Sequence, residues 1–561
     1  MTASNSNPAL PLPDGPLQRL VRYADVALLG GILLALAANF FLVARQSINW
    51  DEFNFLSQVH AYLRGDLVDR LQTLHVHLFA GLPDVSPNEA DQIVAARRVI
   101  AVVAAANALL IYGIARRFVD RPAALFGLCA YLGMSFVVDN GTAFRTDPMA
   151  TFLALLACFA VLRKPGGAAG AAIAGAVMAV AMMVTVKSIF YVGTLGLLFL
   201  AMGETWRKRL RLCFAAALAG APILALLYWW HAESLAAARD VVPLAGLGST
   251  GNKMFLADGL FPRWLDWLAG VIANPFLWAA AIAGAVLSWR TLRRDADPAR
   301  RREARTLLVL ALPLLTPLIY RNAFDYYYVF ILPPAAWLAG IAYQRLRLVA
   351  LQPAGRFAAR LLVVVVALQL ALLLAYVSQQ WPARIGLQRA TIEGVHQVFP
   401  EPASYIDGFG AIASFPRIGF FMSSWGVDSY RAASVPMFAA LVAEHQPPLL
   451  VADSPSLYAA LVPGFEVPEK RLLLPEDARF LSDHYLQYWG MLFVAGTRFA
   501  AGETARDFTI AVAGDYRIEG AGPVRIDGRG FMPGDIVSLS AGPHRFDGDT
   551  GTETRLVWAA A

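Results

Sequence analysis

Carboxylates stand at two points where an apolar stretch of the chain meets a polar loop. Asp51 and Glu52 follow Trp50 just after the first long apolar run, and Asp147 follows Arg145 at the start of a later one. A carboxylate at such a position can take a proton from a hydroxyl group, so all three acids are candidate catalytic residues. Acidic residues also favour the first turn of a helix. A capping role therefore stays open beside the catalytic one.

Cationic side chains occur at comparable positions. Lys187 lies between two apolar runs with almost no loop, and Arg321 precedes a segment that contains Tyr327 and Tyr328. The planar guanidinium group of Arg suits phosphate. Lys187, Arg321 and Arg145 are therefore candidate phosphate ligands, and the two tyrosines are candidate residues of a donor or acceptor pocket. A snorkelling lysine and an aromatic belt at the membrane surface are the structural alternatives.

Three histidines and one tryptophan complete the candidates. His75 and His77 are separated by one residue, and His231 follows two tryptophans. Histidines near carboxylates can bind a divalent cation such as Mg²⁺, Mn²⁺ or Zn²⁺, so these three are candidate metal ligands. Histidines at this spacing also occur on exposed strands without a metal. Trp50, beside the acidic pair, is a further candidate pocket residue.

The composition places these residues next to a lipid bilayer. Hydrophobic residues make up 57% of the 561 residues and charged ones 16%, with a mean hydropathy of +0.51, against roughly 45–50% and 25% in a soluble chain. This excludes a disordered chain and a coiled coil. The net charge of +6 does not indicate nucleic acid, because Lys and Arg gather in alternate loops, as in Arg290–Arg305. The sequence also contains no glycine-rich nucleotide-binding loop.

Eleven apolar stretches approach the length of about 20 residues that a bilayer span requires. They cover residues 24–44, 99–115, 121–138, 148–162, 166–186, 188–203, 210–230, 267–289, 304–320, 326–344 and 357–379. The Arg-rich loops face the cytoplasm if the N-terminus is cytoplasmic, and an odd number of spans then places the C-terminus outside. We expect a polytopic α-helical membrane protein.

The chain changes character near residue 381, beyond which the apolar runs are too short to span. We predict a cytoplasmic tail over residues 1–20, disordered over 1–16, and a transmembrane catalytic domain over 21–380. Short buried strands between helical stretches predict an α/β domain over 381–505. Alternating strands with glycine turns predict a β-rich subdomain over 506–561, a small sandwich of a kind that can bind carbohydrate.

These residues together resemble the GT-C glycosyltransferases. The resemblance rests on the acidic pair after the first span, the Arg145-Thr146-Asp147 sequence at the fourth, Lys187 near the next hairpin, and the tyrosine-rich segment that ends at Pro333-Pro334. It is strongest to the bacterial branch with the aminoarabinose transferases and protein O-mannosyltransferases, and it covers about residues 20–380. It implies a sugar donor on a polyprenyl phosphate in the bacterial inner membrane. The acceptor would be a glycan, lipid or protein on the periplasmic side, where the C-terminal domain would lie.

The resemblance also implies roles for the acidic residues. Asp51 would be the general base that takes the proton of the acceptor hydroxyl, with inversion at the anomeric carbon. Glu52 would assist it or bind metal. Asp147 would position the donor or the acceptor.

The cations receive roles from the same resemblance. Lys187 would contact the carrier phosphate and stabilise it as charge builds on the leaving group, and Arg321 and Arg145 would share that task. His231 falls where some members of the family place a metal-contacting histidine.

One segment departs from the aminoarabinose branch, and two other functions compete. Residues 74–79 lack the Lys-Pro-Pro run usual in the first loop of that branch, which argues against lipid A as acceptor and aminoarabinose as sugar. The alternatives are a transporter or flippase of envelope glycolipids and a non-catalytic envelope scaffold or sensor. Transporters place ionisable residues near the bilayer midplane, whereas the spans here are nearly free of charge.

Overall fold

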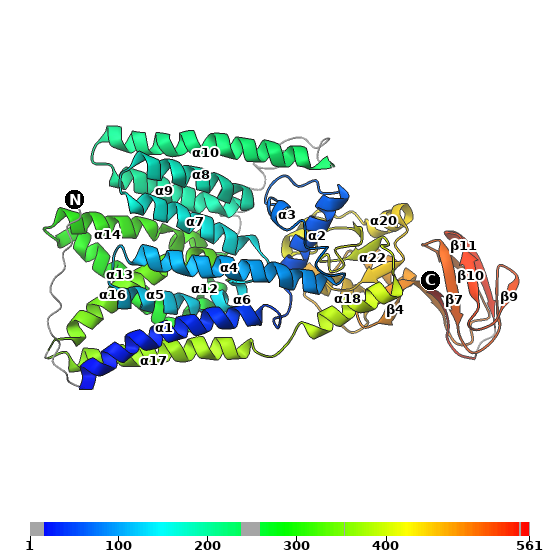
Figure 1. Cartoon of the computed structure of the whole chain (residues 1–561). Coiled ribbons are helices and arrows are strands. Elements are labelled where there is room, and N and C mark those ends of the chain that lie inside the picture. Colours follow the sequence, from blue (N-terminus) through cyan, green and yellow to red (C-terminus); the bar gives the residue numbers. More distant parts are fainter. Residues whose placement is uncertain (1–15, 237–258, 353, 549–550, 560–561) are drawn as a thin grey trace. The chain divides into compact units, whose positions relative to one another are not determined.

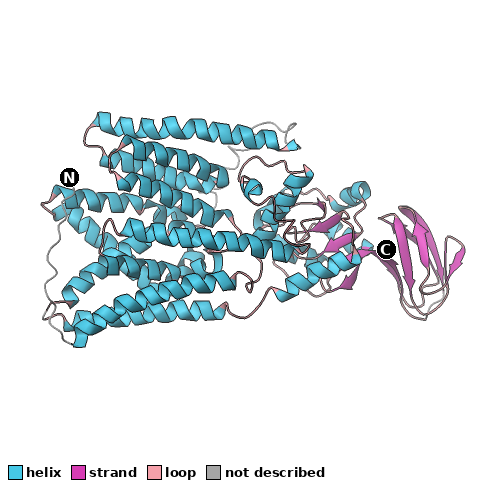
Figure 2. Cartoon of the chain, viewed as in Figure 1, coloured by secondary structure: helices cyan, strands magenta, loops and turns pink. Residues whose placement is uncertain are grey.

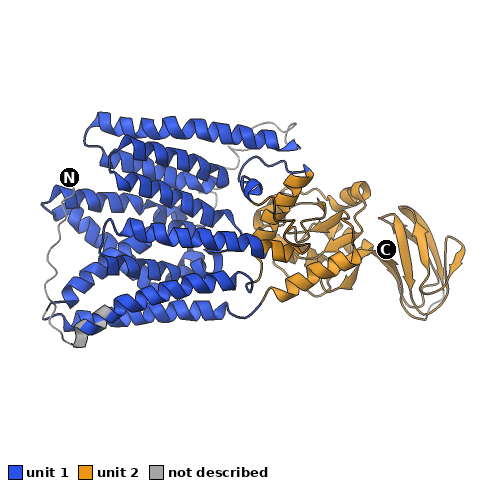
Figure 3. Ribbon diagram, in the orientation of Figure 1, with its two compact units in different colours: residues 1–46, 65–78, 94–383 blue, residues 47–64, 79–93, 384–561 orange. Residues whose placement is uncertain are grey.

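Two compact units make up the computed structural model, which describes residues 16–236, 259–352, 354–548 and 551–559. The first unit comprises residues 1–46, 65–78 and 94–383, and the second comprises residues 47–64, 79–93 and 384–561 (Figure 3). Two short segments from the amino-terminal part of the chain thus fold with the carboxy-terminal part. Residues 1–15 of the predicted disordered tail lie outside the described residues.

The first unit is built of helices (Figures 1 and 2). They are α1 (Pro16–Leu42), α3 (His75–Leu78), α4 (Glu89–Ala115), α5 (Arg121–Leu132), α6 (Ser135–Asn140), α7 (Thr146–Arg163), α8 (Ala168–Val184), η1 (Val186–Ser188), α9 (Ile189–Met202), α10 (Trp206–Ser234), α12 (Trp264–Ala273), α13 (Pro275–Arg294), α14 (Pro298–Leu310), η3 (Leu312–Leu318), η4 (Asp325–Tyr327), α15 (Tyr328–Ile331), α16 (Pro333–Ala350) and α17 (Arg356–Gln379). The first turn of α4 belongs to the second unit.

Six of these helices are long and apolar enough to cross a membrane, judged by length and composition among the described residues. They include Tyr23–Leu42 of α1, α4, α7, α10, α13 and α17. Further apolar helices are shorter, such as α8 and the segment Val186–Met202. The predicted polytopic helical fold is confirmed, whereas the count of eleven spans stays a prediction.

Several predicted spans are divided, and prolines and glycines account for the divisions. The stretch 267–289 forms two helices that meet at Asn274, because a residue before proline is disfavoured in the helical conformation. The side chain of Asn274 then accepts a hydrogen bond from Leu277 N at 3.1 Å and begins α13. The stretch 121–138 ends its first helix before Gly133. In the stretch 304–320, α14 gives way to a 3₁₀ helix that contains Pro317.

Small residues let the helices of the first unit approach closely. A Cβ atom on Gly127 of α5 would lie 2.2 Å from the carbonyl oxygen of Ala336 on α16, and one on Gly284 of α13 would lie 1.9 Å from that of Leu338. Helix association within lipid relies on such close packing, because apolar side chains gain little from leaving an apolar solvent. The fold therefore requires glycine at both positions.

The second unit is an α/β domain joined to a β-rich region (Figures 1 and 2). Its helices are α2 (Trp50–Arg64), α18 (Gly386–Val398), α19 (Ser424–Ala433), α20 (Phe438–His445), α21 (Pro455–Leu461), η5 (Glu469–Arg471) and α22 (Pro475–His484). Its strands are β1 (Tyr405–Asp407), β2 (Arg417–Ile418), β3 (Leu449–Val451), β4 (Tyr485–Trp489), β5 (Leu492–Phe499), β6 (Ala505–Ile510), β7 (Gly514–Glu519), β8 (Val524–Ile526), β9 (Arg529–Phe531), β10 (Ile536–Leu539), β11 (Gly542–Gly548) and β12 (Thr554–Trp558).

One strand connects the two parts of this unit. The larger sheet has the order β10-β7-β12-β5-β3-β1-β2, with β4 also paired to β5. Strand β1 is parallel to β2 and β3, whereas β5 is antiparallel to β3 through pairs such as Leu449 with Val494. The far end of β5 pairs with β12, for example Thr497 with Leu556. A second sheet has the order β6-β11-β8-β9. The predicted β-rich C-terminal region is thus confirmed.

A buried carboxylate ties the loop 79–93 to the carboxy-terminal domain. Glu89 is fully buried and accepts hydrogen bonds from Ser414 Oγ at 2.6 Å and from His396 Nε2 at 2.9 Å. The hydrogen bond to Glu89 raises the pKa of His396 above its usual value, and burial of the imidazole opposes that effect only in part. The protonated histidine therefore stabilises the folded unit.

We expect the substitution His396→Ala to lower stability more at low pH than at high pH. The raised pKa means that the contribution of the imidazolium is fully present below about pH 6.5 and is lost as pH rises through the folded-state pKa. A hydrogen bond to a charged group contributes about 1.5–3 kcal/mol. Thermal unfolding of the full chain in detergent between acidic and alkaline pH measures this, with the more exposed His445→Ala as control. An equal loss at both extremes would contradict the assignment.

Candidate functional site

A buried ion cluster forms where α7 begins. Asp147 lies in the first turn of α7 and is only 2% exposed. Its Oδ1 accepts a hydrogen bond from Lys187 Nζ at 2.8 Å, and its Oδ2 lies 3.4 Å from Arg145 Nε. Lys187 belongs to the short η1 helix between α8 and α9, which brings its side chain to α7. Three of the residues singled out from the sequence thus meet in one cluster.

A tyrosine covers the two cations of this cluster. The guanidinium carbon of Arg145 lies 3.7 Å from the ring centre of Tyr326, and Lys187 Nζ lies 4.7 Å from the same point. Cations are attracted to the face of an aromatic ring, more strongly where water is excluded. The cluster thus brings two cationic side chains together, and such groups suit an anion such as phosphate.

Tyr326, and not the predicted Tyr327 or Tyr328, is the tyrosine that contacts the cations of the cluster. Tyr327 is fully buried, and its hydroxyl shares a 2.7 Å hydrogen bond with Thr316. Tyr328 is also fully buried, with its ring 5.2 Å from that of Phe136. The sequence shows three consecutive tyrosines and no signal that separates them, because the 3₁₀ turn of η4 decides which one meets the cations. A pocket role for Tyr327 and Tyr328 stays a prediction.

Arg321 lies just before η4. Its backbone carbonyl accepts a hydrogen bond from Arg263 Nε at 3.3 Å. Arg263 in turn stacks on Phe324, with 4.0 Å between its guanidinium carbon and the ring centre. The proposed contact of the Arg321 side chain with phosphate stays a prediction.

The histidines form a hydrogen-bonded cluster of their own. His231 Nε2 lies 2.8 Å from Thr73 Oγ1, and His231 Nδ1 lies 2.8 Å from His77 Nε2. The ring of Trp230 lies 4.2 Å from that of His77, and burial lowers the pKa of His77. Neutral imidazoles therefore suit this cluster. His75 lies nearby on the same short helix, with its ring 6.2 Å from that of Phe144.

This geometry does not fit a metal centre at the histidines. Two nitrogens that ligate one tetrahedral zinc ion at about 2.0–2.1 Å would lie about 3.3 Å apart. His77 Nε2 and His231 Nδ1 are only 2.8 Å apart, which is the distance of a hydrogen bond. The other ring nitrogen of His231 is already bonded to Thr73. Within the described ranges, no three His, Cys, Asp or Glu side chains are grouped to hold a metal ion. No catalytic step below uses one.

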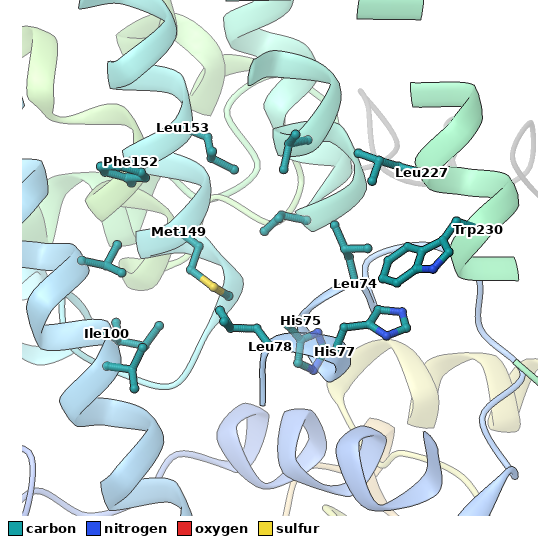
Figure 4. Close-up of a pocket in the computed structure, with 14 residues that line it drawn as sticks. Leu74, His75, His77, Leu78, Ile100, Met149, Phe152, Leu153, Leu227 and Trp230 are labelled. Carbon is teal, nitrogen blue, oxygen red and sulfur yellow. The ribbon is translucent and has the colours of Figure 1, made fainter. Parts of the chain in front are cut away.

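An apolar pocket of about 360 Å³ opens next to the histidine cluster (Figure 4). Hydrocarbon side chains from α4, α7, α8 and α10 line it, and His75, His77 and Trp230 close one end. Two lining residues, Met149 and Val184, lie only two and three positions along the chain from Asp147 and Lys187. A pocket of this kind suits an apolar ligand whose charged end reaches the cations.

Asp51 and Glu52 lie on α2 in the second unit, where a capping box begins the helix. Asn49 Oδ1 accepts a hydrogen bond from Asp51 N at 3.0 Å, and Glu52 Oε1 accepts one from Asn49 N at 3.0 Å. Glu52 is 1% exposed, whereas Asp51 is partly exposed. The capping interpretation therefore describes the Glu52 carboxylate, and Asp51 is the more exposed of the two acids.

The loop after β1 holds α2 at both ends. Trp50 packs against Phe409 and Phe421, with ring centres 5.2 Å and 6.0 Å away. At the other end of α2, Arg64 Nη1 donates a hydrogen bond to the carbonyl oxygen of Ala413 at 3.0 Å. Trp50, a predicted pocket residue, thus anchors the helix that carries Asp51.

Two aspartates, the buried Asp407 and the half-buried Asp453, shape that loop, and sequence reasoning missed both. Asp453 accepts hydrogen bonds from Gly408 N at 2.7 Å and Phe409 N at 3.1 Å, and Asp407 accepts one from Ala411 N at 2.7 Å. Burial and the neighbouring Asp407 carboxylate raise the pKa of Asp453 well above its usual value. The sequence signal is an aspartate that ends or follows each of two short apolar strands.

We expect the substitution Asp147→Asn to destabilise the first unit by about 3–5 kcal/mol, because it leaves two buried cations without their carboxylate. The thermal midpoint of the purified full chain in detergent measures the loss. The exposed pair between Arg302 and Glu204 supplies the control, since Glu204→Gln should cost at most about 1 kcal/mol. Equal midpoints for the two variants would contradict a buried ion pair.

Residues 89–230 match the dolichyl-phosphate-mannose-protein mannosyltransferase family. A search of curated proteins gave no match. Among solved structures, ArnT from Cupriavidus metallidurans bound to undecaprenyl phosphate is 18% identical with a TM-score of 0.54, covering 78% of this chain and 95% of that one.

A second solved structure is the archaeal oligosaccharyltransferase AglB from Archaeoglobus fulgidus, in complex with an inhibitory peptide and a dolichol-phosphate. It is 14% identical with a TM-score of 0.50, and the match covers 76% of this chain and 69% of that one. The resemblance predicted from the acidic pair and the Arg-x-Asp sequence is confirmed at the level of the fold. The chain is a multi-pass membrane protein with the GT-C fold of glycosyltransferases.

Proposed function

We propose that the chain is a membrane glycosyltransferase that moves a sugar from a polyprenyl-phosphate carrier to an acceptor hydroxyl. The buried cluster of Asp147, Lys187 and Arg145 carries this proposal, because it gathers two cations close in the chain to residues that line an apolar pocket. A carrier of this class combines an anionic phosphate with a hydrocarbon chain. The similar structures of ArnT and AglB hold undecaprenyl phosphate and dolichol-phosphate, which supports the assignment.

The cations would act on the leaving group. As the bond between the sugar and the phosphate oxygen breaks, negative charge grows on the phosphate. Lys187 and Arg145 would stabilise that charge from fixed positions in a site with little water, where such stabilisation is strongest. Asp147 holds both cations in place through its two carboxylate oxygens. Arg321 is assigned a supporting role at the same phosphate.

Asp51 would act on the acceptor. Its carboxylate would take the proton of the acceptor hydroxyl as that oxygen attacks the anomeric carbon, and displacement in line would invert the configuration there. The Glu52 carboxylate is engaged at the start of α2, so we assign Glu52 to positioning the helix that carries the base. Sugar and acceptor are assigned only by class: a sugar on a lipid phosphate, and a glycan, lipid or protein hydroxyl.

We infer that the protein lies in the inner membrane of a bacterial cell. The N-terminus would lie in the cytoplasm of a bacterial cell, and the α/β domain over residues 381–505 and the β-rich subdomain over 506–561 would lie in the periplasm. The positive charges of the loop Arg290–Arg305 support this orientation, because such residues gather on the cytoplasmic side.

We expect the substitution Asp51→Asn to reduce kcat about 10²–10⁴-fold, the usual contribution of a general base, while the protein remains folded. The assay follows transfer of labelled sugar from a panel of polyprenyl-phosphate sugars by the purified full chain. Asp84→Asn, at an exposed acid of the same unit, is the matched control. Full activity in the Asp51 variant would reject Asp51 as the base.

For Lys187→Ala we expect mainly a raised KM for the lipid-linked donor, because the variant loses a direct contact to the phosphate. A smaller fall in kcat should accompany it as the leaving group loses stabilisation. Lys208→Ala, at a lysine that pairs with Glu204 at 3.7 Å outside the cluster, should leave both constants unchanged. A donor dependence that does not change in Lys187→Ala would remove this residue from the phosphate site.

A further inference from the structure

A second hollow lies on the second unit, and its lining includes neither Asp51 nor the two aspartates Asp407 and Asp453. It is a groove of about 370 Å³ between α18 and the hairpin of β4 and β5. Its walls include Glu393, Gln397, Tyr488, Trp489 and Leu492. We call it the α18 groove. Nothing in the proposed transfer reaction uses these residues.

One face of α18 supplies the polar wall of the α18 groove. Ala390, Glu393, Gly394 and Gln397 recur at the spacing of one helix face, and Glu393 and Gln397 are exposed one turn apart. The opposite face of the helix is buried, for example at Val395. A carboxylate and an amide therefore point outward from the same face of a firmly packed helix.

Two adjacent aromatic residues supply the other wall. Tyr488 is 43% exposed and Trp489 is 49% exposed. Successive residues of a regular strand point to opposite faces, so both would not normally line one groove. The pairing of β4 with β5 shifts register between Gln487 and Trp489, and such a bulge redirects side chains. The irregular strand thus brings both rings to the same hollow.

A glycine lets the indole of Trp489 lie against the helix. A Cβ atom on Gly394 would be 3.2 Å from Trp489 Cζ3, closer than an ordinary contact. Glycine inside a helix costs roughly 0.5–1 kcal/mol relative to alanine. Here the cost is offset by the close approach of a large ring that remains half-exposed. One edge of the Trp489 indole is therefore held against α18, and its other edge remains open to the groove.

We propose that the α18 groove binds a saccharide. A pyranose ring has an apolar face of C–H groups and a rim of hydroxyl groups. The exposed rings of Tyr488 and Trp489 match the apolar face, and the Glu393 carboxylate and Gln397 amide can accept and donate hydrogen bonds to the rim. The volume lies within the usual range of small-molecule sites, about 300–1,000 Å³.

The charge of the lining narrows the class of saccharide. The residues that form the α18 groove include a carboxylate and neither Lys nor Arg. An anionic sugar would face the Glu393 carboxylate without a compensating cation, whereas a neutral or amino-substituted sugar would not. This site is independent of the proposed transfer reaction, because binding here requires no chemistry at Asp51 or Lys187.

The test is retention of defined oligosaccharides by the full chain in detergent. The probes are hexamers of glucose, mannose, galactose, N-acetylglucosamine and glucosamine, with oligogalacturonate as the anionic probe. We expect the wild-type protein to bind at least one neutral or amino probe. Trp489→Ala should weaken binding about tenfold or more, as for an aromatic residue that carries much of the energy of a site. Gln397→Ala should weaken it less.

The control is Phe465→Ala, an exposed aromatic residue of the same unit outside the α18 groove. It should bind as the wild type does. If Trp489→Ala fails to fold, Trp489→Phe keeps the test open, because it retains a ring and should retain part of the affinity. Transfer activity is measured separately, so a failure of the proposed enzyme does not alter this result.

Four outcomes would overturn the proposal. They are retention of none of the probes by the wild-type protein, equal binding by Trp489→Ala and the wild type, preference for the anionic probe, and a changed oligomeric state in Trp489→Ala with unchanged oligosaccharide binding. The last result would assign the two rings to contact between copies of the chain.

Discussion

The proposed donor site depends on the hydrogen-bonded ion pair between Asp147 and Lys187. Burial of a charge costs several kcal/mol unless a partner compensates for it, and Asp147 is the partner of both Lys187 and Arg145. In the proposed function, the two cations would attract the phosphate of the donor. The apolar pocket would hold its hydrocarbon chain. Each part of the proposed donor follows from this arrangement.

Much of the fold could be predicted from periodicity and length. Long apolar runs predicted the helices, and alternating residues with glycine turns predicted the β-rich region over 506–561. The helix break at Asn274 was missed because apolar residues continue on both sides of it. Strand β11 has no clear local signal, because residues 542–548 contain a proline and several charged or polar side chains; the strand is defined by its partners β6 and β8. The bounds of these elements depend on contacts with distant parts of the chain, which the local sequence pattern does not contain.

The candidate site shows the same division. The residue types of Asp147, Lys187 and Arg145 indicated an anion site, but only the fold shows that the three meet. The 3₁₀ turn at Tyr326 selected one of three identical residues, which no sequence pattern can do. Asp453 escaped notice because its importance depends on a neighbouring parallel strand far away in the chain. The chemistry of a single side chain can be predicted from its residue type. Which side chains meet in space can be known only from the fold.

Strand β5 makes the second unit mechanically continuous. Its first residues pair with β3 and β4 in the α/β part, and its last residues pair with β12 in the β-rich part. A flexible tether would let two modules reorient, but here a twist or shift of one sheet must be transmitted along the same backbone to the other. The β-rich region is therefore not an independent module. Its removal would leave the last residues of β5 without hydrogen-bond partners, and this unpaired strand edge would promote aggregation.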